Sequence, residues 1–357
     1  MSERPAGEGR HAAATGGQFT PLVSAGSGLP ARVVRRAALA LVRATLLVSA
    51  TPAALLVRKA FAADGAKTTA ALARHAPKDV DAALDVRYGD EPDMLLDVFR
   101  PASARGPLPA LVWVHGGGFV GGAKEEIAGY LKVVASHGFA VVGPRYSLAP
   151  GHRYPTPPRQ MMAALAYLQA DAERLGIDAT RIAVAGDSAG AHIAAQLAAL
   201  VTTPGYAERV GVAPTITPQE LRCLVLACGP YDLRLARHPA TPAGKDLMRT
   251  VLWAYSGTRG YLDDPSFAPW SIPDHVTAAF PPAFVTVGSA DPLRRHSERL
   301  AEALRGAGAD VETLFFPEDH EPPLDHEYQF DLDTAAGRLF LERLVAFLSR
   351  RLEQRSP

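Results

Sequence analysis

Six short apolar runs alternate with longer stretches of helical pattern over most of the chain. Each run has six or seven residues rich in Val, Leu, Phe and Ala, which is typical of strands buried on both faces. These runs occupy 109–115, 139–144, 181–186, 221–227, 283–288 and 311–316. The stretches between and after them predict helices at 122–136, 158–175, 188–201, 293–305 and 334–352. Such alternation predicts a mostly parallel sheet with helices on both faces.

Two earlier segments extend this sheet. Residues 85–88 and 94–100 are joined by the turn sequence Gly89-Asp-Glu-Pro92, and they predict an antiparallel hairpin at the start of the fold. With this hairpin the central sheet has about eight strands. No internal repeat is found, and an α/β domain of this length often stays single.

A G-x-S-x-G sequence lies where the apolar run 181–186 meets the helical stretch after it. The sequence is Gly186-Asp187-Ser188-Ala189-Gly190. Between a strand and a helix, this pattern is a nucleophile elbow, whose tight turn lifts the serine hydroxyl out of the chain. Ser188 is therefore the candidate nucleophile, and we expect Asp187 to act on the dipole of the following helix. A turn of small residues that only lets helix and strand pack closely is the competing interpretation.

A glycine run follows the apolar segment 109–115 and supports the catalytic interpretation. The residues are His115-Gly-Gly-Gly-Phe119, and glycines leave backbone N–H groups bare and free to take unusual angles. Attack on an ester carbonyl builds negative charge on its oxygen, which needs such donors. We expect the N–H groups of Gly117, Gly118 and Ala189 to form an oxyanion hole. Neither a P-loop nor a dinucleotide-binding glycine pattern fits this run.

These two motifs together resemble the hormone-sensitive-lipase-like group of α/β-hydrolases, the bacterial family IV esterases. The resemblance extends from about Val80 to the C-terminus and includes Arg145-Tyr-Ser-Leu-Ala-Pro150, which is similar to a D-Y-R-L-A-P-E segment of that group. The chain has Arg145 and Gly151 at the two acidic positions of that segment. The resemblance implies an α/β-hydrolase fold with a helical cap and a Ser-Asp-His triad in that chain order.

The triad acid is expected at Asp291. This residue follows the apolar run 283–288 in the sequence Asp291-Pro-Leu293, which matches the D-P-L segment of the resembling group. A carboxylate just beyond a strand end can reach a histidine on a neighbouring loop. A plain N-cap for the helix at 293–305 is the competing interpretation.

Two histidines compete for the role of base. His320 lies closer to the end of the run 311–316, and its separation from Asp291 suits the resembling group. His326 lies in Leu324-Asp-His-Glu-Tyr328, which resembles the P-H-G-F segment of that group. We choose His326 and keep His320 as the alternative.

The resulting prediction is a serine carboxylesterase that hydrolyses short- to medium-chain esters through an acyl-serine intermediate. An amidase or deacetylase could use the same triad, and a ligand-binding receptor of the same fold is the alternative outside the enzymes. We expect no cofactor and no metal site, because the two cysteines do not form a metal-ligating pattern. The zero net charge argues against a nucleic-acid partner.

Charge is distributed unevenly along this neutral chain. Residues 1–78 carry 11 Lys and Arg against 3 Asp and Glu. We expect a disordered tail at 1–30, rich in Gly, Ala, Ser and Pro, and N-terminal helices at 31–80 that form a cap or associate with a membrane. The catalytic domain is expected at 81–357, with a helical cap insertion at 231–280.

These features set the expected partners and location. The basic, apolar segment near the N-terminus makes membrane-surface association an alternative to a plain cytoplasmic location. The expected ligand is a small ester, and a homodimer stays among the expected assemblies.

Overall fold

The computed structural model describes residues 49–237 and 242–353. All of them belong to one compact unit, Thr45–Pro357, and the other unit, Met1–Ala44, lies outside the described residues. The disordered tail expected at 1–30 and the first part of the N-terminal helices expected from residue 31 therefore lie outside them as well.

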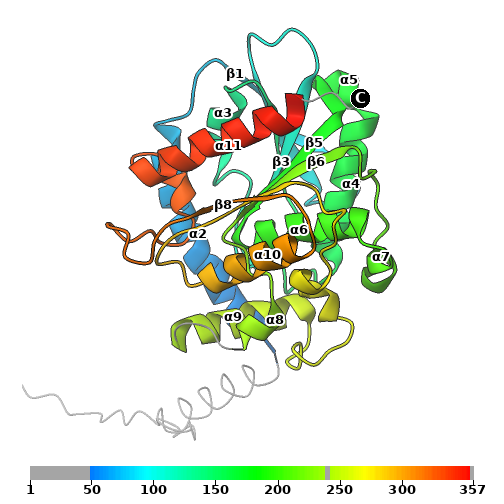
Figure 1. The fold of residues 1–357 in the computed structure, drawn as a ribbon, viewed down its shortest axis with the longest axis vertical. Coiled ribbons are helices and arrows are strands. Elements are labelled where there is room, and N and C mark those ends of the chain that lie inside the picture. Colours follow the sequence, from blue (N-terminus) through cyan, green and yellow to red (C-terminus); the bar gives the residue numbers. More distant parts are fainter. Residues whose placement is uncertain (1–48, 238–241, 354–357) are drawn as a thin grey trace, which may run out of the picture. The chain divides into compact units, whose positions relative to one another are not determined.

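In the described part of the chain, eight strands form one sheet in the order β1-β2-β4-β3-β5-β6-β7-β8 (Figure 1). β1 pairs antiparallel with β2 and β2 pairs antiparallel with β4, whereas all other neighbours are parallel. The prediction of a mostly parallel sheet of about eight strands is confirmed. The strands are β1 (Val80–Arg87), β2 (Leu95–Pro101), β3 (Leu108–Val114), β4 (Ala140–Pro144), β5 (Ile177–Asp187), β6 (Leu221–Ala227), β7 (Ala283–Val287) and β8 (Val311–Phe315).

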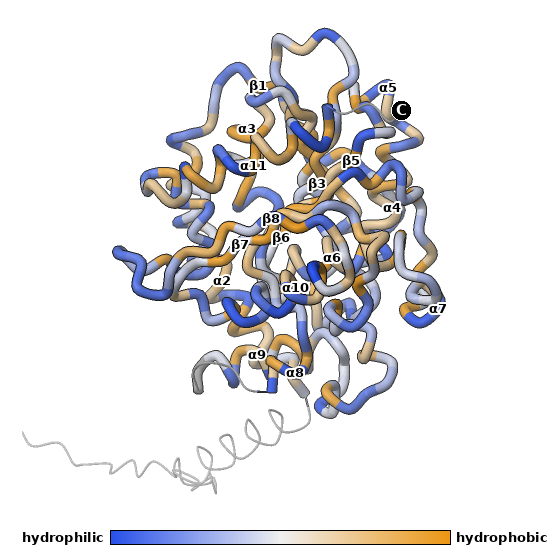
Figure 2. Tube along the Cα trace, viewed as in Figure 1, coloured by the Kyte–Doolittle hydropathy of each residue, from blue (hydrophilic) through white to orange (hydrophobic). Residues whose placement is uncertain are grey.

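Helices cover both faces of this sheet, because consecutive residues of the central strands are buried and so need cover on both sides. Figure 2 shows that these strands are mainly hydrophobic. α4, α6 and α10 pack in one hydrophobic cluster, and α3 and α11 pack in the other. The helices are α2 (Thr51–Ala73), α3 (Ala128–Ala135), α4 (Thr156–Ala170), α5 (Ala172–Leu175), α6 (Ser188–Thr202), α7 (Tyr206–Val210), α8 (Leu233–Ala236), α9 (Pro242–Ser256), α10 (Arg294–Gly306) and α11 (Ala335–Glu353). Three short 3₁₀ helices are η1 (Ala268–Trp270), η2 (Ile272–Asp274) and η3 (Tyr328–Phe330).

Two predicted helices differ from the observed ones. The helix predicted at 122–136 begins only at Ala128, because the turns before it place the Lys124 ammonium in a buried site. There it contacts the carboxylates of Asp97 at 2.7 Å and Asp85 at 2.9 Å. The helix predicted at 158–175 is interrupted at Asp171, whose backbone angles are not helical, and this gives α4 and α5.

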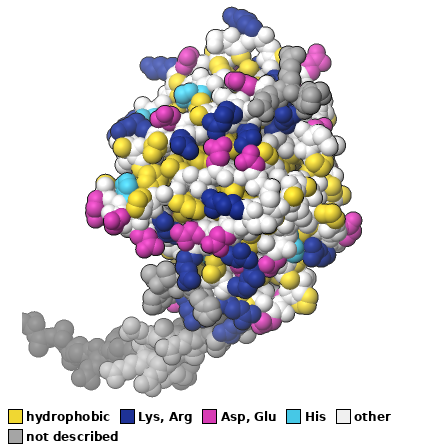
Figure 3. Space-filling view, in the orientation of Figure 1, with side chains coloured by type: hydrophobic (Ala, Val, Ile, Leu, Met, Phe, Trp, Pro, Cys, Tyr) yellow, Lys and Arg dark blue, Asp and Glu magenta, His cyan; other side chains and the backbone are white. Residues whose placement is uncertain are grey.

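The elements α2 and α9 lie outside the sheet layers and contact each other. α2 also contacts α3, and α9 belongs to the segment in which a cap insertion is predicted. Within residues 49–237 and 242–353, no helix has both the length and the apolar character needed to cross a membrane. Lys and Arg side chains mix with Asp and Glu side chains on the face seen in Figure 3.

Candidate active site

The turn between β5 and α6 holds Ser188 in a strained backbone conformation. Its φ is +49°, in the left-handed region that side chains other than glycine rarely adopt. A Cβ at Gly186 would lie 2.4 Å from the carbonyl carbon of Gly190. A Cβ at Gly190 would lie 2.0 Å from the carbonyl oxygen of Val114. Only glycine fits at these two positions, and the turn therefore places the Ser188 hydroxyl at the start of α6.

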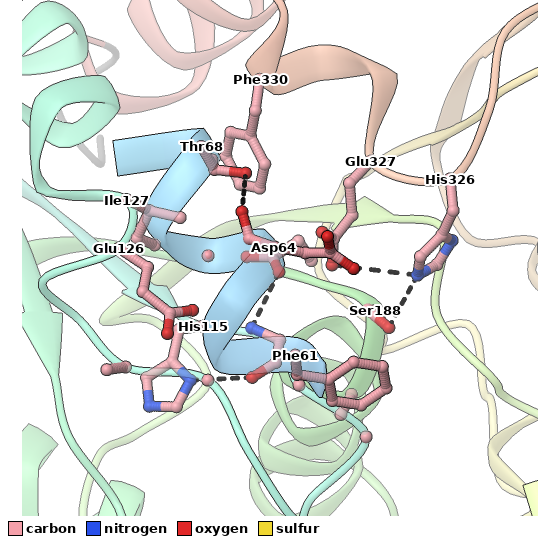
Figure 4. Close-up of a pocket in the computed structure, with 18 of the residues that line it drawn as sticks. Phe61, Asp64, Thr68, His115, Glu126, Ile127, Ser188, His326, Glu327 and Phe330 are labelled. Atoms are coloured by element: carbon pink, nitrogen blue, oxygen red, sulfur yellow. Dashed lines mark hydrogen bonds and ion pairs between the residues drawn. The ribbon is translucent and has the colours of Figure 1, made fainter. Parts of the chain in front are cut away.

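The structure brings His326 and Asp291 to this serine, and Figure 4 shows His326 beside Ser188. The Nε2 atom of His326 lies 2.9 Å from Ser188 Oγ, and Nδ1 lies 2.8 Å from Asp291 Oδ2. The other carboxylate oxygen of Asp291 accepts a hydrogen bond of 2.7 Å from the N–H of Leu293. Asp291 is not the N-cap of α10, which is Leu293, but its carboxylate binds both the turn before that helix and the histidine.

His320 lies elsewhere in the same loop. Its Nδ1 atom is 2.8 Å from the carbonyl oxygen of Pro322, and the edge of its ring meets the ring of Phe316 at a centroid distance of 5.0 Å. Neither contact connects it to Ser188. The geometry thus favours His326 over His320 as the base.

The glycine run after β3 forms a turn with exposed backbone donors. The N–H groups of Val120 and Gly121 both bind the carbonyl oxygen of Gly117, at 3.1 and 2.8 Å. Gly117 and Gly118 have φ values of +109° and +59°. Within the described residues, their own N–H groups donate to no protein acceptor. Ala189 lies in the first turn of α6, where backbone N–H groups have no partner inside the helix.

Comparisons with known proteins identify the family and the fold. Residues 111–320 match the family described as the alpha/beta hydrolase fold. The chain is 32% identical over 279 residues to the carboxylesterase NlhH of Mycobacterium tuberculosis, which covers 75% of this chain and 81% of that protein. It is 29% identical over 258 residues to the ethyl acetate hydrolase of Pseudomonas putida, which covers 66% of this chain and 77% of that protein.

The chain belongs to the α/β-hydrolase family. Its relatives place it in the hormone-sensitive-lipase-like group, as its motifs predict. The structure of a bacterial heroin esterase superposes with a TM-score of 0.66 at 28% identity, covering 83% of this chain and 91% of that one. Esterase B from Lactobacillus rhamnosis has the same fold, with a TM-score of 0.72 at 24% identity over 84% of this chain and 96% of that one.

In this α/β-hydrolase, Asp187 has a contact that the sequence interpretation missed. Its carboxylate accepts hydrogen bonds from Trp113 Nε1 at 2.7 Å and from the N–H of Gly116 at 2.8 Å. It makes no side-chain cap to α6, so the expected role at the helix dipole is replaced by one that ties the glycine run to the elbow. The partners lie more than 70 residues away in sequence, and no local pattern reveals them.

Glu327 is a second residue that the sequence interpretation missed. Its Oε1 atom lies 3.8 Å from His326 Nε2, and its carboxyl group is hydrogen-bonded to that of Asp187. Burial raises the pKa of Asp187 well above its usual value, and the negative charge of Glu327 raises it further. Glu327 has a φ of +61° and occupies the glycine position of the P-H-G-F segment, which is the available sequence signal.

Cys228 contacts the histidine from the end of β6. Its thiol sulfur lies within 4.8 Å of a ring nitrogen of His326, and its own φ of +46° is in the strained left-handed region. Burial alone would lower the pKa of His326, but Cys228 and the Asp291 carboxylate favour the charged imidazole and raise this pKa well above its usual value. The sulfur, carboxylate oxygen and ring nitrogen of Cys228, Asp291 and His326 lie within 4.8 Å of one another. Among the described residues, this is the group whose side chains are close enough to hold a metal ion together.

Other buried histidines are held neutral. Burial lowers the pKa of His115 to about 4 and that of His192 to about 3. His115 Nδ1 lies 2.8 Å from the carbonyl oxygen of Gly116, next to the glycine run. His192 stacks on Trp270 and contacts its carbonyl oxygen, which is a packing role.

A cavity of about 800 Å³ contains Ser188 and His326. Helix α2 forms one wall, and Figure 4 shows Phe61 and Asp64 of this helix beside Ser188. One part of the lining is apolar and consists of Phe61, Phe119, Leu247, Met248 and Val251. Another part carries charge and includes Asp64, Glu126 and Glu327.

Proposed function

We propose that this protein is a serine carboxylesterase with Ser188 as nucleophile, His326 as general base and Asp291 as the acid that orients it. The observation that carries the proposal is the continuous hydrogen-bonded series from Asp291 through His326 to Ser188, which opens into the cavity. The carboxylesterase and ethyl acetate hydrolase among its relatives support ester hydrolysis as the reaction.

The reaction follows from these positions. His326 takes the hydroxyl proton at Nε2 while Ser188 Oγ attacks the ester carbonyl carbon. The N–H groups of Gly117, Gly118 and Ala189 stabilise the oxygen that becomes negative, and they need no reorganisation because their turn is already formed. Asp291 fixes the imidazole tautomer and stabilises its charged form.

The second half of the reaction reverses these roles. The alcohol leaves with the proton held by His326, and the acyl group remains on Ser188. Water then loses a proton to the same Nε2 atom and attacks the acyl carbon, which releases the carboxylic acid and restores the serine.

A covalent probe tests the nucleophile directly. A fluorophosphonate should label the wild-type protein once, at Ser188, and should leave Ser188→Ala unlabelled. The wild type should hydrolyse p-nitrophenyl acetate and p-nitrophenyl butyrate, whereas a matched p-nitroanilide measures any amidase activity. A protein that is neither labelled nor active on either ester would refute the proposal.

We further propose that residues 32–57 associate with a membrane surface. Arg32, Arg35 and Arg36 precede a mainly apolar stretch in the sequence, and Leu55 and Leu56 at the start of α2 are 48% and 70% exposed. Co-sedimentation with anionic and with neutral vesicles tests this. The full chain should bind anionic vesicles more strongly, and a chain that begins at residue 49 should lose that binding. Equal binding by both chains would contradict the proposal.

A further inference from the structure

Two carboxylates of the cavity, those of Glu126 and Glu327, form no ion pair with a Lys or Arg side chain in the described part of the chain. In the described part of the chain, Glu327 is ion-paired with His326 and hydrogen-bonded to Asp187, and it has no other charged partner. Glu126 packs its carboxyl group against α2, where a Cβ at Gly65 would lie only 2.3 Å from its Cδ atom. Burial raises the pKa of Glu126, and the nearby charge of Glu327 adds to this effect.

The remaining charges of the lining do not neutralise these two. Lys67 lies 2.7 Å from Asp64, and Arg74 lies 2.5 Å from Asp333, so both basic side chains are already paired. Asp331 adds one more acid to the lining. The cavity is therefore negative beside the nucleophile.

The Asp187–Glu327 pair contributes one negative charge and not two. A hydrogen bond between two carboxyl groups requires one proton between them. Asp187 is 2% exposed, and burial disfavours its charged form more than the hydrogen bonds from Trp113 and Gly116 favour it, so the shared proton lies on Asp187 and the pair keeps one negative charge. This charge lies next to His326, close to where the oxyanion forms, and on its own it opposes the reaction.

The wall of the cavity also holds a polar atom that lacks a partner. His115 is 2% exposed and lines the cavity, and its Nε2 atom has no hydrogen-bond partner among the described residues. A buried polar atom of this kind is normally satisfied by a ligand or by water. The wall beside Glu126 therefore contains an unsatisfied hydrogen-bonding atom as well as apolar side chains.

We propose that the cavity selects esters that carry a positively charged ammonium group, with Glu126 and Glu327 as the specificity-determining residues. This inference rests on the proposed esterase function. A cation near both carboxylates is attracted to them, and it offsets the charge of Glu327 as the oxyanion forms. Anionic esters are repelled for the same reason.

The test compares two substrates of nearly equal shape. Acetylcholine carries a quaternary ammonium, and 3,3-dimethylbutyl acetate has carbon in place of that nitrogen. The wild type should show a kcat/KM about tenfold or more higher for acetylcholine. Where turnover of the two acetates is too slow to measure, choline and 3,3-dimethylbutanol can be compared as inhibitors of p-nitrophenyl acetate hydrolysis. Choline should then inhibit at a lower concentration than 3,3-dimethylbutanol.

Variants assign this preference to residues. Glu126→Gln removes a charge outright and should lower the preference about tenfold. Glu327→Gln moves the charge of the pair onto buried Asp187, so its effect should be smaller, about threefold. Asp325→Asn is the matched control, because it removes an exposed carboxylate of the same loop that does not line the cavity. Melting temperatures of all variants exclude loss of folding as the cause.

The possible failures are distinguishable. Absence of p-nitrophenyl acetate hydrolysis and of fluorophosphonate labelling would refute the proposed function itself. Hydrolysis of that ester with no preference for the cation, in turnover or in inhibition, would refute only the charge selectivity. A preference that Glu126→Gln and Glu327→Gln leave unchanged would refute the assignment to these residues.

Discussion

The elbow and the helix that covers it are built in opposite ways. Ser188 lies between a buried strand and α6, whose residues from 188 to 200 are all buried. Helix α2 forms the facing wall of the cavity, but it is mostly half-exposed or exposed, and Arg58 connects it to the loops below. The chemistry is therefore held by backbone geometry inside the core, whereas the shape of the cavity depends on a helix with few anchors. Mutations should affect catalysis and substrate binding separately.

The largest difference should come from His326, the histidine that we propose as the base. His326→Gln removes the base and should lower kcat by about 10⁴-fold or more, as should Ser188→Ala. His320→Gln keeps the hydrogen bonds between Ser188, His326 and Asp291 and should retain nearly full activity. Steady-state kinetics on p-nitrophenyl acetate measures all three. A large loss in His320→Gln with an active His326→Gln would reverse the assignment of the base.

Much of this region could be predicted from the sequence because its signals are local. The apolar runs define the strands, and the glycines of the elbow and of the run 116–118 mark turns that other residues cannot form. The chain order of the α/β-hydrolase fold then leads to Asp291.

The remaining features depend on contacts between distant segments. The partners of Asp187 lie on and just after β3, and the role of α2 as a wall depends on where one helix packs. No local pattern signals the proximity of Cys228 and His326, because the two residues are distant in the sequence and meet only in the folded chain. The helix start at Ala128 was also mispredicted, because the burial of Lys124 is a tertiary effect.

Mutations in α6 should also lower the free energy of unfolding more than mutations on the exposed face of α2. Leu197 in α6 is completely buried, so Leu197→Ala should lower the free energy of unfolding by about 3–5 kcal/mol. Leu56 in α2 is 70% exposed, and Leu56→Ala should change it by less than about 0.5 kcal/mol. Urea unfolding followed by circular dichroism gives both values. Similar losses in the two variants would show that Leu56 is packed as tightly as Leu197.

A smaller effect should follow from removing the hydrogen bonds that hold helix α2 in place. The guanidinium of Arg58 donates to the carbonyl oxygens of Val120 at 2.5 Å and Ala149 at 2.7 Å. Arg58→Ala removes these charge-assisted bonds, so we expect KM to rise about tenfold with a smaller change in kcat. Amide hydrogen exchange should become faster in α2 and stay unchanged in α6. Lys59→Ala is the matched control because Lys59 is exposed, and an equal rise of KM in that variant would contradict an anchoring role for Arg58.

The smallest expected effect concerns the pH profile, and it tests whether the buried thiol of Cys228 influences the pKa of His326. His326 acts as a base only when it is neutral, and its raised pKa means that it stays protonated to a higher pH than an ordinary histidine. Activity should therefore rise with pH through this raised pKa. Cys228→Ala removes one of the groups that favour the charged imidazole, so the acidic limb of kcat/KM should move to lower pH.

Cys223→Ala is the matched control. Cys223 is buried like Cys228 and lies on β6, but it does not contact His326, so the pH profile of this variant should match that of the wild type. A shift to higher pH in Cys228→Ala, or equal shifts in both variants, would mean that the thiol does not stabilise the charged histidine and that Asp291 alone sets its pKa.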